Sequence, residues 1–451
     1  MTHRVFVANR GEIAVRIIEA CDRLGFETVL GVSAADRDTL AARRAGRVLT
    51  LGGARSTDSY LLLPAVVHAA IATGCTALHP GYGFLSERPE LARLCAENGI
   101  TFVGPSPEAL DALGDKLKAR ALAESLGVPV APGGTAETEA EIDALAAEIG
   151  YPILVKAAFG GGGRGMKLVH GRAELLDAWR VASSEASAAF GDGTVFLERY
   201  VTDAKHIEVQ VLGDRHGHYL HLGERECSVQ YRYQKVVEEA PCAAIDQATR
   251  ELLHDSALRI ASSLQYVGLG TVEFLYDVQR RQVSFLEVNP RLQVEHPVTE
   301  AVTGVDLVRE QLLVALGEEL TLRQEDIRLE GHAVECRITA QDPARGLAPS
   351  PGPVTRWRPP VGRGLRLDTH VYEGYRFPPY YDALMAKLIA WGPDRPAAIA
   401  TMREALDRFE IEGLATSREL HRRILAHPEF QDGSVTTHWL EPIVTDQEVT
   451  A

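Results

Sequence analysis

Apolar and polar positions alternate at two periods through the first hundred residues, which indicates strands separated by helices. Short apolar runs predict strands at 4–8, 27–32, 76–78 and 100–103. Apolar positions at helical spacing predict helices at 13–24, 59–73 and 89–98, and Gly25 supplies a stop signal after the first of them. Strands that alternate with helices form a parallel sheet with helices packed on it. We therefore predict a parallel α/β unit at the N-terminus.

Beyond a glycine- and proline-rich boundary at 104–107, the pattern becomes mixed. It predicts helices at 110–126 and 138–149, and strands at 151–156, 166–170, 194–201 and 206–212. After Gly331 strands and turns dominate, with strands at 332–338 and 365–372 before helices at 395–409 and 417–426. A chain of 451 residues has room for about three domains. We expect α/β and α+β units in sequence, without internal repeats.

Two strands near the middle of the chain carry the most informative polarity. Residues 270–276 and 283–289 have strand patterns, and the polar run between them predicts a hairpin. If the turn centres on Arg280, Glu273 lies opposite Glu287. Like charges that face each other destabilise a sheet, so this pair favours a bound cation. Mg²⁺ with phosphate oxygens is the usual occupant of an all-oxygen site.

The second of these strands continues into an alternating row. The even positions are the apolar Leu286, Val288, Leu292 and Val294, with Pro290 among them. The odd positions are Glu287, Asn289, Arg291, Gln293 and Glu295. An extended chain sends successive side chains to opposite sides, so the polar row should line one side until Pro290 ends regular pairing. A solvated face with an Arg291–Glu295 ion pair is the alternative, but five successive hydrogen-bonding positions opposite another acid favour a site.

A glycine run follows the predicted strand at 151–156. It matches Gly-x-Gly-x-x-Gly at Gly160, Gly162 and Gly165. A dinucleotide fold needs a helix next, whereas 166–170 predicts a strand, and no Gly-Lys-Ser/Thr closes a Walker A loop. A hairpin tip rich in backbone N–H groups, with Lys156 at its base, can wrap phosphates. We favour phosphate binding over a mobile surface loop.

Two other segments concentrate polar groups. The loop HPGYGFLSE at 79–87 follows a strand, where ligands often bind in open α/β sheets, although a turn with Glu87 starting a helix is equally consistent. The segment 227–239 places Lys235 among polar and aromatic residues. Its density of hydrogen-bond donors favours an anion site over a solvated loop.

Composition limits the class of protein. A hydrophobic fraction of 45% and a charged fraction of 24% are ordinary for a globular protein. No apolar run approaches the ~20 residues of a membrane span, and the N-terminus has no signal-peptide pattern. The six cysteines are scattered without Cys-x-x-Cys, which indicates reduced thiols in the cytoplasm. The net charge of −15 argues against nucleic-acid binding.

Taken together, these stretches resemble the biotin carboxylase family of the ATP-grasp superfamily. The matching motifs keep the family's order over nearly the whole chain: VANRGEI at 7–13, the 79–87 loop, the glycine run, QKVVEEAP at 234–241, NPRLQVEHPV at 289–298, HAVECRI at 332–338 and PPYYD at 378–382. The resemblance implies an N-terminal parallel-sheet domain at 1–112 and an ATP-grasp domain at 113–329, with a glycine-tipped lid at about 130–202. A C-terminal mixed domain would follow at 330–446.

The resemblance also implies a reaction and its residues. The family carboxylates the ureido nitrogen of biotin on a carrier protein, using MgATP and bicarbonate. ATP would be held by Lys116, Lys156, Gly162, Gly163, Glu198, Arg199, Tyr200, Val201, His206, Gln230 and Tyr233. One or two Mg²⁺ ions, with Mn²⁺ as a substitute, would be held by Glu273, Glu287 and Asn289. Bicarbonate would be held by Lys235, Arg291, Gln293 and the Val294 backbone, with Glu295 as its base and Arg337 at the biotin ureido oxygen.

Three departures from the family's pattern stand out. Tyr231 and Tyr233 replace an arginine and a frequent histidine before Gln-Lys, so that hydrogen-bonding phenols stand where basic side chains are usual. Arg199 occupies a position that is often lysine. No Met-Lys-Met biotinylation motif is present. We therefore expect the carrier to be another polypeptide.

The leading hypothesis is the biotin carboxylase component of a multi-component acyl-CoA carboxylase, of the acetyl-CoA type used in fatty acid biosynthesis. Its expected partners are a biotin carboxyl carrier protein, carboxyltransferase subunits and a second copy of the chain, in the cytoplasm. One alternative is an ATP-grasp ligase that joins another carboxylate to an amine. The other is a non-catalytic nucleotide-binding scaffold that regulates a partner.

Overall fold

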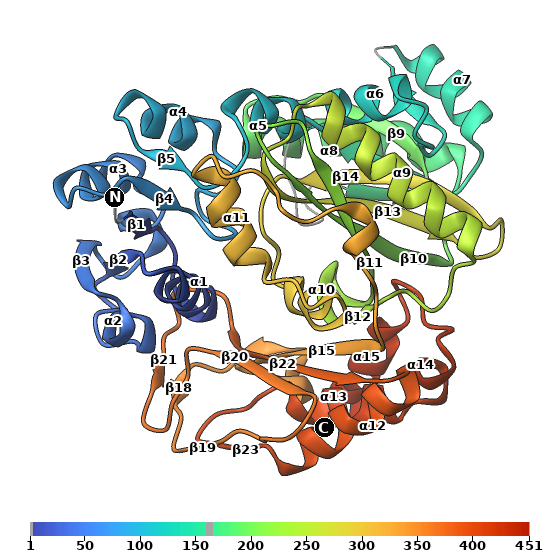
Figure 1. Cartoon of the computed structure of the whole chain (residues 1–451). Helices are drawn as coiled ribbons and strands as arrows, with labels where there is room; N and C mark the ends of the chain where they lie inside the picture. Colours follow the sequence, from blue (N-terminus) through green and yellow to red (C-terminus); the bar gives the residue numbers. More distant parts are fainter. Residues whose placement is uncertain (1–2, 137, 159–165, 451) are drawn as a thin grey trace.

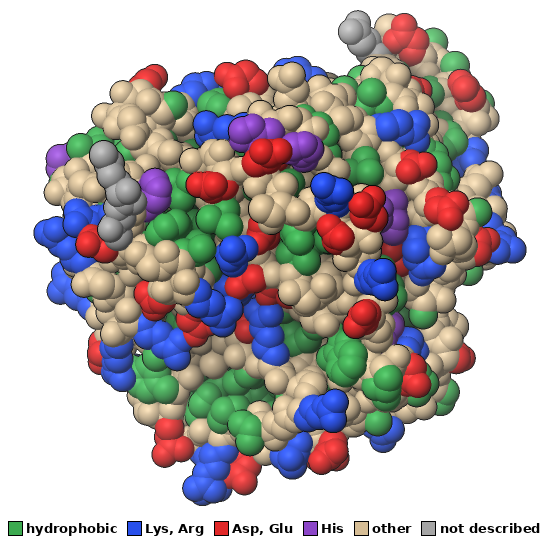
Figure 2. Space-filling view, viewed as in Figure 1, with side chains coloured by type: hydrophobic (Ala, Val, Ile, Leu, Met, Phe, Trp, Pro, Cys, Tyr) green, Lys and Arg blue, Asp and Glu red, His purple; other side chains and the backbone are tan. Residues whose placement is uncertain are grey.

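The protein is described by a computed structural model over residues 3–136, 138–158 and 166–450 (Figure 1). Three sheets with their helices form its framework, in agreement with the predicted α/β and α+β fold class. Within these described ranges, no helix combines the length and apolar character needed to cross a membrane. Acidic and basic side chains are interspersed over the face drawn in Figure 2.

The N-terminal sheet is parallel, as predicted, with the order β3-β2-β1-β4-β5. β1 lies at the centre of this sheet, where its apolar residues Val5, Phe6 and Val7 are all buried. α1 ends where Gly25 adopts a left-handed φ of 69°. The elements are β1 (Arg4–Val7), α1 (Gly11–Leu24), β2 (Glu27–Ser33), α2 (Leu40–Arg44), β3 (Arg47–Gly52), η1 (Ser56–Asp58), α3 (Leu63–Ala72), β4 (Ala77–His79), α4 (Pro89–Glu97), β5 (Thr101–Phe102) and α5 (Pro107–Gly114).

The central sheet is antiparallel, with the order β14-β13-β10-β11-β12-β15-β22-β20. It runs from the middle of the chain into the strands after Gly331, because β12 pairs with β15. Its strands are β10 (Ala204–Gly213), β11 (Tyr219–Tyr231), β12 (Gln234–Ala240), β13 (Gly268–Asp277), β14 (Gln282–Asn289), β15 (His332–Thr339), β20 (Leu365–Thr369) and β22 (Leu384–Gly392). The helices against it are α9 (Gln247–Ser263), α10 (His296–Thr303) and α11 (Leu307–Ala315). α1 packs against α11 and β20, so the N-terminal and central cores are continuous.

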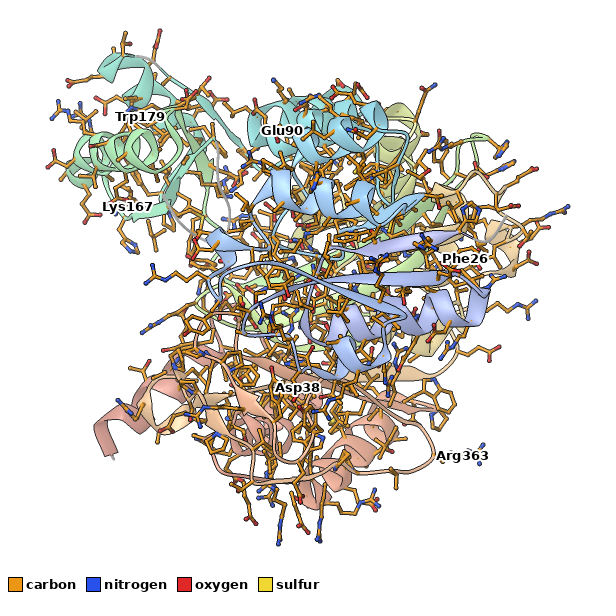
Figure 3. The ribbon with its side chains drawn as sticks, turned by 90° about the vertical axis from the view of Figure 1, so that its left-hand side faces the viewer. Phe26, Asp38, Glu90, Lys167, Trp179 and Arg363 are labelled. Atoms are coloured by element: carbon orange, nitrogen blue, oxygen red, sulfur yellow. The ribbon has the colours of Figure 1, made fainter. Side chains whose placement is uncertain are left out.

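A four-stranded sheet with the order β6-β9-β7-β8, called here the small sheet, projects from one corner with α7 and α8 (Figure 3, near Lys167 and Trp179). Its elements, after α6 (Lys116–Ser125), are β6 (Gly133–Thr135), α7 (Glu139–Ile149), β7 (Ile153–Ala157), β8 (Met166–Val169), α8 (Arg172–Phe190) and β9 (Val195–Arg199). β7 and β8 form the predicted strand pair that flanks the glycine run. The glycine run itself, within 159–165, lies outside the described residues.

The last hundred residues pack helices under the central sheet (Figure 1). α12 (Arg395–Arg408) lies against β22 and β15, and α13 (Arg418–Ala426) lies against α12. The remaining elements are η2 (Gln324–Asp326), β16 (Gln341–Asp342), η3 (Pro343–Arg345), β17 (Ala348–Pro349), β18 (Gly352–Pro353), β19 (Arg356–Arg358), β21 (Arg376–Phe377), β23 (Glu410–Glu412), α14 (Pro428–Asp432) and α15 (Leu440–Thr450).

One predicted element is wrong in detail. The single helix predicted at 110–126 is two helices, because Asp115 leaves helical conformation between α5 and α6. Its side chain caps α6 by accepting hydrogen bonds from the N–H groups of Leu117 (2.9 Å) and Lys118 (3.2 Å). The segment 227–239, for which no secondary structure was predicted, belongs to the hairpin of β11 and β12, which excludes the solvated loop that was its alternative interpretation. Its polar residues escaped a strand prediction because Ser228 and Gln230 are buried in place of apolar groups.

Candidate active site

A cavity of about 1050 Å³ lies between the N-terminal unit, the small sheet and the central sheet. Tyr82 lines the cavity from the N-terminal unit, Lys156 from the small sheet and Glu273 from the central sheet. Every predicted site residue in the described part of the chain lines it, namely Lys116, Lys156, Glu198, Arg199, Tyr200, Val201, His206, Gln230, Tyr233, Lys235, Glu273, Glu287, Asn289, Arg291, Gln293, Val294, Glu295 and Arg337. Gly162 and Gly163 lie outside the described residues.

The β13–β14 hairpin forms one wall, and Glu273 pairs with Glu287 as predicted. The strict alternation predicted for β14 is wrong, because a β-bulge follows this pair. Phe274 pairs with Phe285, which leaves Leu286 as the extra residue of the bulge. Leu286 consequently lines the cavity and is not buried on the opposite side.

Regular pairing ends at Asn289, where the prediction placed its end. The backbone then turns, and the N–H of Arg291 donates to the carbonyl of Asn289 at 2.8 Å. Arg291, Gln293 and Glu295 still reach the cavity. Val294 lines it as well, although alternation placed its side chain elsewhere, since the chain is no longer extended.

Glu273, Glu287 and Asn289 present two carboxylates and an amide oxygen, the ligand types that suit Mg²⁺. Burial and the Glu273 carboxylate raise the pKa of Glu287, and Lys116 only partly offsets them. Glu273 itself accepts hydrogen bonds from Lys235, Asn289 and Gln293, each at 2.9 Å. An extra cation beside Glu287 would relieve the repulsion between the two acids. The donor set therefore fits a magnesium ion.

Lys235 is the central cation of the site. Its ammonium donates to Glu208, to Glu273 and, at 2.5 Å, to Glu295. Burial works to lower the pKa of Lys235, but the three carboxylates more than offset it and hold the pKa well above its usual value. The side chain is therefore positively charged throughout the neutral range.

Glu295 lies between two cations. Besides Lys235, it accepts a hydrogen bond from Arg337 Nη2 at 3.0 Å. Burial would raise the pKa of Glu295, but Lys235, Arg337 and Arg225 hold it well below the usual range of a glutamate. The carboxylate is ionised at neutral pH and faces the cavity.

Arg291 stands at the rim. Its guanidinium donates to Glu87 at 2.5 Å and to the side-chain oxygen of Asn289 at 2.9 Å. Glu87 comes from the 79–87 loop, so the contact joins the N-terminal unit to the β14 row. This places the loop at the cavity, as one of the two interpretations of its sequence predicted.

The opposite end of the cavity is formed largely by the small sheet. Lys156 is paired with Glu198, which also accepts from Arg120 at 3.2 Å. Burial lowers the pKa of Lys116, which lies among the charges of Glu287, Lys156 and Glu198. Two lysines and one glutamate thus face the acids of the central sheet across the cavity.

The predicted nucleotide residues near this end make contacts of several kinds. Arg199 donates two hydrogen bonds to the Ile149 carbonyl, at 3.1 and 2.9 Å. The Tyr200 hydroxyl lies 2.6 Å from His438 Nε2. Gln230 Nε2 lies 2.8 Å from His206 Nδ1, and His206 Nε2 lies 2.8 Å from Glu273.

Two residues that support the site, one basic and one acidic, were not predicted. Arg225 is fully buried and donates to Glu208, Gln210, Thr299, Thr271 and Gln293. Glu208 in turn accepts from Lys235. The only sequence signal was an acid and a base within alternating apolar strands, which is equally typical of a solvated face.

The departures at Tyr231 and Tyr233 fall on the turn of the β11–β12 hairpin. Tyr231 pairs with Gln234, so Arg232 and Tyr233 form a two-residue turn with φ of 50° and 65°. Tyr231 is buried, whereas Tyr233 is 51% exposed. Both side chains line the cavity.

A nucleotide-sized cavity between a small sheet and a larger antiparallel sheet, with lysines on one wall and acids on the other, is the arrangement of the ATP-grasp class. The sequence families described as Biotin carboxylase, N-terminal domain, as Carbamoyl-phosphate synthase L chain, ATP binding domain, and as Biotin carboxylase C-terminal domain match residues 1–110, 115–323 and 335–442. The chain is 47% identical to biotin carboxylase 1 of Bacillus subtilis over 98% of both chains. The chain therefore belongs to the biotin carboxylase family and is an ATP-dependent ligase.

Two other similar proteins carry different names. A pyruvate carboxylase of Rhizobium etli, solved with the allosteric activator acetyl coenzyme-A, superposes with a TM-score of 0.93 and is 43% identical over 98% of this chain and 40% of its own. The biotin carboxylase domain dimer of Hydrogenobacter thermophilus 2-oxoglutarate carboxylase, solved with MgADP, ADP and bicarbonate, superposes with a TM-score of 0.94. It is 44% identical over 98% of both chains. The family membership thus leaves several final acceptors open.

Proposed function

We propose that this chain carboxylates biotin at the expense of ATP and bicarbonate, by way of carboxyphosphate. The family membership and the MgADP and bicarbonate named for the Hydrogenobacter structure support the proposal. The observation that carries it is the placement of Glu295, a buried carboxylate between Lys235 and Arg337, in the same cavity as Arg291. That arrangement suits a base for an anionic nucleophile.

In this proposal the cavity has a nucleotide end and a bicarbonate end. ATP is bound by Lys116, Lys156, Gly162, Gly163, Glu198, Arg199, Tyr200, Val201, His206, Gln230 and Tyr233. Bicarbonate is bound by Lys235, Arg291, Gln293 and the Val294 backbone. Glu273, Glu287 and Asn289 would hold Mg²⁺, which offsets phosphate charge when bound. The division into domains at 1–112, 113–329 and 330–446, with 130–202 as the lid, is part of the proposal.

Glu295 acts as the general base of the first step. It accepts the bicarbonate proton, the freed oxygen attacks the γ-phosphorus of ATP, and ADP leaves. The cations that keep Glu295 ionised also weaken it as a base, because they hold its pKa low. Lys235 and Arg337 would lose part of their contact with Glu295 as they turn to the substrates, and the basicity of Glu295 would rise at that moment.

Arg337 serves the second step. Carboxyphosphate breaks down to CO₂ and phosphate, and the phosphate takes the N–H proton of the biotin ureido group. The negative charge then lies partly on the ureido oxygen, where the permanently charged guanidinium of Arg337 stabilises it. The ureido nitrogen adds to CO₂, which completes carboxybiotin.

The proposed acceptor and partners follow the sequence hypothesis. The biotin is carried by a separate biotin carboxyl carrier protein, and carboxyltransferase subunits pass the carboxyl group to an acyl-CoA of the acetyl-CoA type. A homodimer and a cytoplasmic location are also proposed. Capture of the protein from its native cell, with detection of biotinylated proteins and mass spectrometry of their companions, tests this assignment. Recovery of pyruvate- or 2-oxoglutarate-carboxylating subunits would contradict the acyl-CoA proposal.

The proposed reaction is tested by ADP release. We expect turnover that requires bicarbonate and rises with free biotin. Arg291→Ala should abolish turnover but leave ATP binding intact, because Arg291 lies at the bicarbonate end. Arg88→Ala, an exposed arginine of the adjoining segment, is the matched control and should change nothing.

Each alternative has a distinct outcome in the same assays. A folded protein that binds ATP but never releases ADP, with free biotin or a biotinylated carrier, would be a scaffold. Bicarbonate-independent ADP release with another carboxylate would identify a different ligase. Either result would overturn the proposed carboxylation.

A further inference from the structure

A row of charged side chains crosses the central sheet beside the cavity. Asp368 on β20 pairs in register with Lys387 on β22, and Lys387 pairs with Arg337 on β15. Glu335 lies two residues before Arg337, and it pairs with Glu238 on β12. Residues two apart on a strand share a face, so Glu335 and Glu238 lie on the face that presents Arg337.

Glu238 and Glu335 are both fully buried. Arg337 Nε donates to Glu238 Oε1 at 2.5 Å. Among the described residues, no donor reaches Glu238 Oε2 or either oxygen of Glu335. Two buried carboxylates at directly opposed positions with three oxygens lacking donors would be costly if both were ionised. The proposed reaction assigns neither residue a role.

The cations near Glu335 are already engaged elsewhere. Arg337 donates to Glu238 and to Glu295. Lys387 donates to the Val294 carbonyl at 3.0 Å and lies 3.1 Å from Glu12.

The other charged groups near Glu335 that the structure describes leave no free cation for it either. Arg366 on β20 lies in the same cross-strand row, but it donates to Asp368 and Glu300. Asp368 beside Lys387 is an acid, and Glu295 at the start of α10 is a second one. His296, the next residue, is neutral because burial lowers its pKa well below the usual value. Burial and the Glu238 carboxylate raise the pKa of Glu335 well above its usual value, and Lys387 and Arg337 only partly offset them.

We propose that Glu335 is a neutral carboxylic acid in the folded enzyme and that it donates a hydrogen bond to Glu238 Oε2. The pair then holds one proton and one negative charge. Burial also raises the pKa of Glu238 to about 7, against the effect of Arg337, so one proton shared by two carboxyl groups suits the neutral range.

Glu238 and Glu335 are thereby positioning residues for Arg337. Glu238 accepts from Arg337 Nε, and Glu295 accepts from Arg337 Nη2. When Glu295 takes the bicarbonate proton, Arg337 loses one anionic partner, and the Glu238–Glu335 pair keeps the guanidinium in place for the ureido oxygen. This role rests on the proposed function, whereas the location of the proton does not.

Infrared spectroscopy of the full-length protein at neutral pH tests the proton directly. We expect a carboxylic-acid C=O band in the wild type that is lost in Glu335→Gln and kept in Glu185→Gln, an exposed control. Wild-type and Glu335→Gln spectra without that difference would overturn the proposal. The measurement needs no turnover, so it stands even if biotin carboxylation fails.

Kinetics of two variants of similar size test the role of the pair. Glu335→Gln keeps a neutral hydrogen-bond donor and should retain kcat and the KM for free biotin within about twofold. Glu335→Leu removes the donor and should raise the KM for biotin about tenfold with the KM for ATP unchanged. Melting temperature and ATP binding establish that both variants are folded. Equal losses in the two variants would contradict the proposal, and absence of wild-type turnover would instead refute the proposed function.

Discussion

At the scale of single residues, Lys235 is a cation that three buried carboxylates share. Lys235 is 13% exposed and serves three carboxylates that are each 5% exposed or less. A salt bridge at the surface is worth little, but a buried acid that loses its partner is expensive. Removing the one shared cation should therefore have a much larger effect than removing any exposed lysine.

Lys235→Met should lower the free energy of unfolding by about 3–5 kcal/mol near neutral pH. In the wild type, the lowered pKa values of Glu273 and Glu295 give stability that is present above their ordinary pKa and lost as the pH falls. Without the ammonium these pKa values lie higher, so the variant gains less stability than the wild type as the pH rises. Denaturant unfolding across the acid-to-neutral range should show a gap between the two proteins that widens with pH.

Lys167→Met is the matched control, because Lys167 on β8 pairs with Glu185 on α8 at 2.9 Å and both side chains are open to solvent. It should unfold like the wild type at every pH. A pH-independent gap for Lys235→Met would mean that the three carboxylates do not depend on its charge.

Glu295→Gln should lower kcat by about 10²–10⁴-fold, the range that a positioned general base contributes. The amide keeps the size of the side chain but cannot accept the bicarbonate proton. ATP affinity, measured by calorimetry, should stay close to the wild type because Glu295 lies at the bicarbonate end. A variant with normal kcat would exclude Glu295 as the base.

At the scale of elements, the sequence was sufficient to predict the pairing of two strands that follow each other directly in the chain. The Glu273–Glu287 register was predictable because a short polar run joins two strands of clear polarity. The bulge at Leu286 was not, since Phe285 and Leu286 are both apolar and either could face the core. The helix break at Asp115 carried a capping signal that the longer apolar periodicity concealed.

The support of the site was harder to predict than its contact residues. Arg225 reaches partners between 15 and 74 positions away in the sequence. Its role depends on which strands become neighbours, and no pattern within β11 encodes that. The resemblance to family motifs predicted which residues line the cavity, because motifs preserve residue types. It did not predict which residues of neighbouring strands pair with each other.

The β11–β12 turn carries strain that another residue would relieve. A two-residue hairpin turn with both φ values positive favours Asn-Gly, and a non-glycine residue there is strained. Tyr233→Gly should therefore raise the free energy of unfolding by about 1 kcal/mol. It should also weaken ATP binding if Tyr233 contacts the nucleotide, so stability and affinity should change in opposite directions. Thermal unfolding and calorimetry measure the two separately.

Gln265→Gly is the matched control. Gln265 has a φ of 46° in an exposed turn after α9 and does not line the cavity. It should gain similar stability without any change in ATP affinity. Weaker ATP binding in both variants would show that Tyr233 has no direct part in nucleotide binding.

At the scale of the whole molecule, two buried lysines join parts of the chain that are distant in sequence. Lys387 on β22 contacts Val294 after β14 and Glu12 on α1. Lys205 on β10 contacts Glu226 at 2.7 Å and the carbonyls of Gly433 and Val435. Only Lys387 holds the backbone of the segment 291–295, where we propose that bicarbonate binds. Comparison of the two lysines therefore separates an effect on the fold from an effect on the proposed site.

Lys387→Met and Lys205→Met should both lower the melting temperature, because each leaves buried acceptors without their donor. Lys387→Met alone should raise the KM for bicarbonate, about tenfold, since the peptide between Val294 and Glu295 loses the contact that orients it. The KM for ATP should change little in either variant. Equal effects of the two substitutions on bicarbonate would show that general destabilisation, and not the orientation of the 294–295 peptide, limits the site.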